Sequence, residues 1–166
     1  LVPAAMGAAS SALHTINKPG TVWFPPGTYN IGNLSNQEIV YNIVDLSNIA
    51  FRSTAASLVM NTTDVSSPLL FRFSNPENIT FEGIRFQDTG TDLSVDWRGV
   101  QCIQLIGGTG AAAFYSGFTI RNCQADSVVT FRHCGNGLNA DKRVRDILVE
   151  NCVVRNSYYG VRTQNN

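Results

Sequence analysis

The segment Asn78-Ile-Thr-Phe-Glu-Gly-Ile-Arg-Phe86 recurs three more times along the chain, in variants that align with it without internal gaps. The other copies begin at Asn48, Gly117 and Asp146, so successive starts lie 30, 39 and 29 residues apart. A period of about 20–50 residues is typical of solenoids and propellers, whose repeats stack to bury a shared apolar side. We therefore expect function to lie along a face made by equivalent positions of successive coils.

Apolar residues recur within the copies at spacings of two, three and two. They align in four columns, which are Ile49/Ile79/Phe118/Ile147, Phe51/Phe81/Ile120/Val149, Thr54/Ile84/Cys123/Cys152 and Ala56/Phe86/Ala125/Val154. Thr54 is the polar exception. Alternation with a period of two indicates a strand, and the extra residue indicates a corner between two short strands. Each copy therefore predicts two strands that meet at a bend and share an apolar inside.

One outward position alternates in charge through the four copies, as Arg52, Glu82, Arg121 and Glu150. Opposite charges on neighbouring strands stabilise their pairing by on the order of a few tenths of a kcal/mol, whereas like charges oppose it. We interpret this column as structural, and it supports the alignment.

A third strand precedes the next repeat in each coil. The aligned segments are residues 69–73, 101–105, 129–133 and 159–163. Their inward columns are Leu69/Gln101/Val129/Tyr159, Phe71/Ile103/Phe131/Val161 and Phe73/Leu105/His133/Thr163, and their outward column is Arg72/Gln104/Arg132/Arg162. Parallel strands joined by short corners, three to a turn, describe an all-β fold, the single-stranded parallel β-helix, with about five coils here.

The first residues differ from the rest of the chain. Ala8, Ala12 and Ile16 lie at helical spacing in an alanine-rich segment that Pro19-Gly20 ends, which predicts a short helix. We expect residues 1–18 to form a cap and residues 19–166 to form the β-helix. The chain stops directly after a third strand, and solenoids need polar caps. We therefore expect a truncated piece of a longer chain, or an end covered by another chain.

Composition excludes several classes of partner. The chain has 166 residues, 14% of them charged, and a formal net charge of +0, so it lacks the basic footprint of a nucleic-acid-binding protein. No apolar run is long enough for a membrane span, and no basic region opens a signal peptide. The cysteines fit no zinc spacing. Stacked free thiols and a disulfide both remain open for them, namely Cys102, Cys123, Cys134 and Cys152.

The alanine-rich segment is followed by Gly20-Thr-Val-Trp-Phe-Pro-Pro-Gly-Thr-Tyr29, and Asn-Ile-Thr-Phe and Asn-Cys repeats come later in the chain. In these motifs the chain resembles the pectin-lyase-like superfamily of right-handed β-helices. That superfamily includes polygalacturonases, polysaccharide lyases and phage tailspikes. The resemblance implies a helix that caps the open end, a polysaccharide partner and a secreted, extracellular or virion-surface location. The fold hosts several activities, so the resemblance implies no single one of them.

The same resemblance implies catalytic carboxylates. Asp96 and Asp126 match the positions of the polygalacturonase aspartates, and Asn156 follows one coil later. Paired carboxylates one coil apart could act as acid and base or hold a calcium ion. The alternative is that they are corner residues that hydrogen-bond their own turns. The family's paired-aspartate and Gly-His-Gly motifs are absent, which weighs against polygalacturonase chemistry.

Arginine dominates the basic residues, because Lys18 and Lys142 are the only lysines. Arginine binds carboxylates and sulfates through two parallel hydrogen bonds, which lysine cannot match. In the family's lyases, arginine on the third-strand sheet neutralises the uronate and removes a proton. The resemblance thus implies catalytic roles for Arg132 and Arg162 and substrate-binding roles for Arg72, Gln104 and Tyr159. The alternative is that the arginines pair with aspartates or cover apolar surface.

We therefore expect a carbohydrate-active β-helix that binds and depolymerises an acidic polysaccharide on the third-strand face. As an enzyme it would be a polysaccharide lyase or a glycoside hydrolase, with calcium as the one cofactor that its carboxylates could hold. The alternative is a non-catalytic structural or adhesive β-helix, such as a segment of a phage tailspike or surface fibre, and a homotrimer would fit that role. A third reading is a fragment of an enzyme whose active site lies in other coils.

Overall fold

The computed structural model describes residues 19–34, 38–62, 68–90, 101–106, 115–126, 130–134, 144–156 and 161–164. Within these ranges every regular element is a parallel β-strand and there is no helix. The expected cap in residues 1–18 lies outside the described residues, so the helix that we predicted there has no support. The strands are β1 (Gly20–Trp23), β2 (Gly27–Leu34), β3 (Ile39–Val44), β4 (Ser47–Thr62), β5 (Leu69–Ser74), β6 (Glu77–Asp88), β7 (Gln101–Ile106), β8 (Tyr115–Arg121), β9 (Gln124–Asp126), β10 (Thr130–Cys134), β11 (Val144–Glu150), β12 (Val153–Arg155) and β13 (Val161–Gln164).

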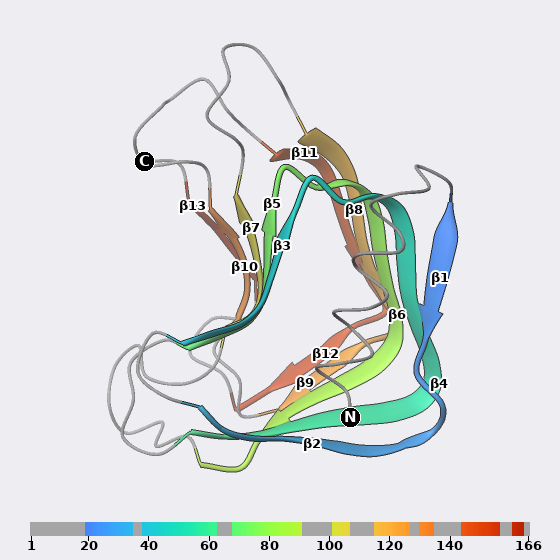
Figure 1. Ribbon diagram of the computed structural model, residues 1–166. Helices are drawn as coiled ribbons and strands as arrows, with labels where there is room; N and C mark the ends of the chain where they lie inside the picture. The colour runs from blue at the N-terminus through green and yellow to red at the C-terminus, as the bar shows by residue number, and fades with distance from the viewer. Residues whose placement is uncertain are drawn as a thin grey trace.

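The strands form a solenoid with three sides (Figure 1). Sheet A follows the order β1-β4-β6-β8-β11, and the later halves of β4 and β6 continue into a second side together with β2, β9 and β12. Sheet B forms the third side, in the order β13-β10-β7-β5-β3. The two strands per repeat and the third strand that we predicted are thus confirmed as sides of a parallel coil.

The described residues amount to about three turns, rather than the five coils that we expected. Residues 91–100 and 107–114, which connect successive strands, lie outside the described ranges.

Phenylalanine rings from the facing sheets fill the interior. Phe51 and Phe81, one coil apart in sheet A, are stacked with their centroids 4.7 Å apart. From sheet B, Phe71 meets Phe81 edge-on at 5.2 Å, and Phe73 meets it edge-on at 5.8 Å. All four rings are buried. Burying an aromatic side chain contributes about 1.5–3 kcal/mol or more, so the burial of these four rings stabilises the described coils.

The corner of β4 differs from the alignment that we predicted. Arg52 pairs with Glu82, but the next pair is Ala56 with Ile84, so residues 53–55 of β4 stand opposite Gly83 alone. The inward column is therefore Ala56/Ile84, followed by Leu58/Phe86, and Thr54 was wrongly placed in it. The buried Ser53 holds the bulge, because its Oγ accepts hydrogen bonds from the amides of Ala55 and Ala56 at 3.1 and 2.7 Å.

The alignment of the third strands needs two changes. Thr130, not Val129, pairs with Gln101, and an irregularity follows before Phe131 pairs with Ile103. The alignment also missed β3, whose Tyr41 and Ile43 pair with Phe71 and Phe73. The register predicted for the outward column and for the other two inward columns is confirmed, including the pairing of His133 with Leu105. The predicted position of Tyr159 lies outside the described residues.

Asparagine and aspartate make the corners. Among the described residues, those other than glycine that have a positive φ are Asp45, Asn48, Asn75, Asn78, Asn122, Asp146, Asn151 and Asn156. These two residue types tolerate the left-handed conformation because their short side chains form local hydrogen bonds. They also bond from coil to coil, since the Asn78 amide donates to Asn48 Oδ1 at 3.0 Å and the Asn75 amide to Asp45 at 2.6 Å. The first residue of each repeat is thus a corner residue.

Gly83 occupies a corner where a side chain does not fit. Its φ is +70°, and a β-carbon there would collide with the backbone carbonyl oxygen of Ser53. Asn122 follows it one coil later with nearly the same φ, +53°. Glycine is therefore required in β6 because the bulge of β4 fills the space beside it.

We predict that Gly83→Asn lowers the free energy of unfolding by about 1–3 kcal/mol, since the backbone of Ser53 would have to move. The matched change Asn122→Gly should cost less than about 1 kcal/mol, because glycine adopts the same φ freely. Urea unfolding of both variants measures the difference. Equal stability of Gly83→Asn and the wild type would show that the bulge does not fill this space.

Cysteine thiols line part of the interior. Cys102, Cys123 and Cys152 are free. Burial raises the pKa of the Cys123 thiol from 9.0 to about 12, and the backbone hydrogen bonds around it oppose this rise. Burial also raises the pKa of Cys102, with the negative charge of Asp88 as a second cause. These thiols are protonated at neutral pH and act as small apolar side chains.

The raised pKa of Cys123 predicts a loss of stability in alkali. The unfolded chain loses its thiol proton near pH 9, whereas the folded chain holds it to about pH 12. The stabilisation is therefore complete below pH 9 and is lost as the pH rises toward 12. We expect the stability advantage of the wild type over Cys123→Ala to shrink by on the order of 1 kcal/mol per pH unit above pH 9. Urea unfolding under reducing conditions measures it, and a constant difference from pH 8 to 10.5 would contradict the prediction.

Candidate functional site

The outward column of sheet B is in register as we predicted. Asn42 pairs with Arg72, and Arg72 pairs with Gln104. Gln104 pairs with Arg132, which pairs with Arg162. The structure thus brings four of the predicted site residues to one register position, at steps of about 4.8 Å between neighbouring strands. We call the positions 42, 72, 104, 132 and 162 the arginine column.

Arg72 is the best-defined member of the arginine column. It lies between Phe71 and Phe73, both fully buried, and its own side chain is partly exposed. Its Nε is buried and has no hydrogen-bond partner in the structure. A buried donor without a partner is costly, and the buried Nε of Arg121 in sheet A is in the same state.

The arginine column contains no carboxylate at its five positions. The charged column of sheet A is different, because Glu82 Oε2 lies 3.1 Å from Arg52 Nε and 3.0 Å from an Arg121 terminal nitrogen. The hydrogen bond to Glu82 raises the pKa of Arg121, and the charge of Glu82 adds to the effect. The register that we predicted for this alternating column is confirmed. Sheet A therefore neutralises its own arginines within the column.

Asp126 lies in β9 of sheet A and so outside the arginine column. One carboxylate oxygen, Oδ2, lies 3.2 Å from a terminal nitrogen of Arg85. The other, Oδ1, accepts a hydrogen bond from the amide of Asn156 at 3.1 Å. These contacts join three successive coils and do not lie within the residue's own turn. Asp96 and Tyr159, our other two candidates, lie outside the described residues.

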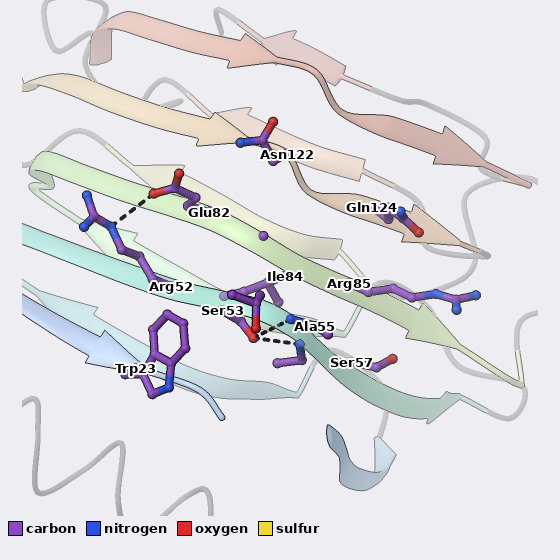
Figure 2. A pocket seen from close by; sticks show the side chains of 13 residues that line it. Trp23, Arg52, Ser53, Ala55, Ser57, Glu82, Ile84, Arg85, Asn122 and Gln124 are labelled. Carbon is purple, nitrogen blue, oxygen red and sulfur yellow. Dashed lines mark hydrogen bonds and ion pairs between the residues drawn. The ribbon is translucent and has the colours of Figure 1, made fainter. Parts of the chain in front are cut away.

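A groove that the sequence did not reveal lies on the outer corner of sheet A (Figure 2). It has a volume of about 720 Å³, and Trp23, Arg52, Gly83, Arg85 and Gln124 are among its lining residues. The side chain of Trp23 is 51% exposed, and Figure 2 shows it beside the ion-paired Arg52. The misplaced Thr54 was the available signal, because a polar residue in an apolar column indicates a break in the repeat.

The described residues contain no group of three or more His, Cys, Asp or Glu side chains that could hold a metal ion. Nor does this part of the chain include a helix that is long and apolar enough to cross a membrane. Comparison of the chain with protein-family models, curated proteins and solved structures gave no match.

Proposed function

We propose that the protein is a carbohydrate-binding parallel β-helix that holds an acidic polysaccharide along the arginine column. The observation that carries the proposal is the lack of any carboxylate at the five positions of that column, where three residues are arginine. The protein as a whole has a formal net charge of +0. The arginines therefore place positive charge locally, on a protein that has no general excess of basic residues.

A polymer suits this column better than a single small anion. The positions of the arginine column recur along the solenoid axis in steps of about 4.8 Å, which is close to the length of one sugar unit. Arginine occupies three of these five positions, with Gln104 between Arg72 and Arg132. Guanidinium groups bind carboxylates and sulfates through two parallel hydrogen bonds. A uronate or sulfated chain that runs along the axis would therefore present anionic groups to several coils at once.

Depolymerisation is the second part of the proposal. Under it, Arg132 and Arg162 neutralise the uronate and take up a proton, and the carboxylates Asp96 and Asp126 contribute acid, base or calcium-binding groups. The contacts of Asp126 with Arg85 and Asn156 favour a structural role for that carboxylate. The resemblance to right-handed pectin-lyase-like β-helices supports a polysaccharide ligand and, with it, a location outside the cell or at a virion surface.

Binding of polygalacturonate to variants of matched charge tests the proposal. We expect Arg72→Ala to raise the Kd roughly ten-fold or more, because a charge-assisted hydrogen bond contributes about 1.5–3 kcal/mol. Arg121→Ala removes the same charge from sheet A, where Glu82 already neutralises it, and should leave the Kd unchanged. Added salt should weaken binding to the wild type.

Several results would contradict the proposal. They are a failure of the folded wild type to bind any acidic polysaccharide in a panel, or an equal effect of Arg72→Ala and Arg121→Ala. A trimer in solution that binds no glycan would favour the structural or adhesive alternative.

An assay for reducing ends and unsaturated uronates tests depolymerisation separately. If the arginines act in cleavage, Arg132→Ala and Arg162→Ala abolish the formation of cleavage products. The activity of Asp126→Asn measures the contribution of that carboxylate to cleavage.

A further inference from the structure

The groove on the outer corner of sheet A is distinct from the arginine column of sheet B. Its volume of about 720 Å³ lies within the usual range of ligand-binding clefts. It runs across the coils from Trp23 in β1 to Gln124 in β9. Three steps between neighbouring strands separate these coils, so the groove spans about 14 Å. That length suits a short oligosaccharide better than a single sugar.

Three departures from the repeat build this groove at one place. β4 carries the bulge of residues 53–55, and β6 carries Gly83 where the next coil has Asn122. Gly83 leaves room for the backbone of that bulge, which lines the groove. β1 adds Trp23 at the register position of Arg52. Departures from an otherwise regular pattern are expected at functional sites, and here three of them coincide.

The charged residues that line the groove are neutralised by their neighbours. Arg52 pairs with Glu82 at 3.1 Å, and Arg85 pairs with Asp126 at 3.2 Å. The polar groups that remain at the surface include the side chains of Asn122 and Gln124, both exposed residues. Figure 2 shows these two residues along the upper side of the groove and Trp23 along the lower side. The groove thus offers an aromatic ring and amide groups without an unbalanced charge.

This combination fits a neutral sugar. A pyranose ring has an apolar C–H face that packs on the face of an indole, and a rim of hydroxyl groups. A side-chain amide can both donate to and accept from such hydroxyls, while the indole supplies a large and rigid apolar surface. We propose that the groove binds a neutral oligosaccharide, with one ring stacked on Trp23 and hydroxyl groups bonded to Asn122 and Gln124. This site does not depend on the proposed acidic-polysaccharide site.

Calorimetric titration with cellohexaose, mannohexaose and xylohexaose tests the proposal. We expect at least one of these neutral hexasaccharides to bind the wild type. Trp23→Ala should raise its Kd roughly ten-fold or more through the loss of the stacking surface, and Trp23→Phe should retain part of the affinity. Gln124→Ala should weaken binding, while Arg72→Ala should leave it unchanged. Urea unfolding establishes that each variant is folded.

Two results would overturn this inference: no binding of any of the three hexasaccharides to the folded wild type, or the same Kd for Trp23→Ala and the wild type. Parallel titrations with polygalacturonate keep the two sites distinct. Retained polygalacturonate binding without hexasaccharide binding would refute the groove alone. Hexasaccharide binding without polygalacturonate binding would refute the arginine column alone.

Discussion

The in-register pairing of parallel strands is the constraint on which the other features depend. Each residue lies beside its equivalent in the next coil, as Phe51 lies beside Phe81 and Phe81 beside Ile120. Inside, this register stacks aromatic and aliphatic side chains into a continuous core. Outside, it produces columns whose charges either cancel or accumulate. A shift of one residue would exchange the two faces, so core and surface depend on the same pairing.

The sequence was sufficient to predict the parallel coil, because alternation with a period of two and a thirty-residue repeat are local patterns. It was also sufficient to align Arg72, Gln104, Arg132 and Arg162, since each of these residues follows an apolar residue at a constant offset. The bulge at Ser53 was not predictable in the same way. It adds two residues at a corner, and its accommodation depends on Gly83, thirty residues away. The tie of Asp126 to Arg85 and Asn156 likewise joins separate coils. The groove depends on both contacts, the one between the bulge and Gly83 and the one between Arg85 and Asp126.

The two surfaces of interest differ in how their charge is balanced. In sheet A, Glu82 holds Arg52 and Arg121, and Asp126 holds Arg85. In sheet B, no carboxylate shares the arginine column. Exposed ion pairs contribute little to stability, so the alternating column of sheet A supports strand pairing by only about a few tenths of a kcal/mol. The two proposals follow this contrast, because we propose an acidic glycan for sheet B and a neutral one for the corner of sheet A.

The stacked, in-register core is tested most directly by comparing the free energies of unfolding of Phe81→Ala and Leu148→Ala with that of the wild type. Phe81 is fully buried among rings from three other strands, whereas the Leu148 side chain is 48% exposed. The register described here predicts a loss of about 3–5 kcal/mol for Phe81→Ala and about 0.5 kcal/mol or less for Leu148→Ala. Losses of equal size would contradict it, because Phe81 would then not lie at the centre of the stack.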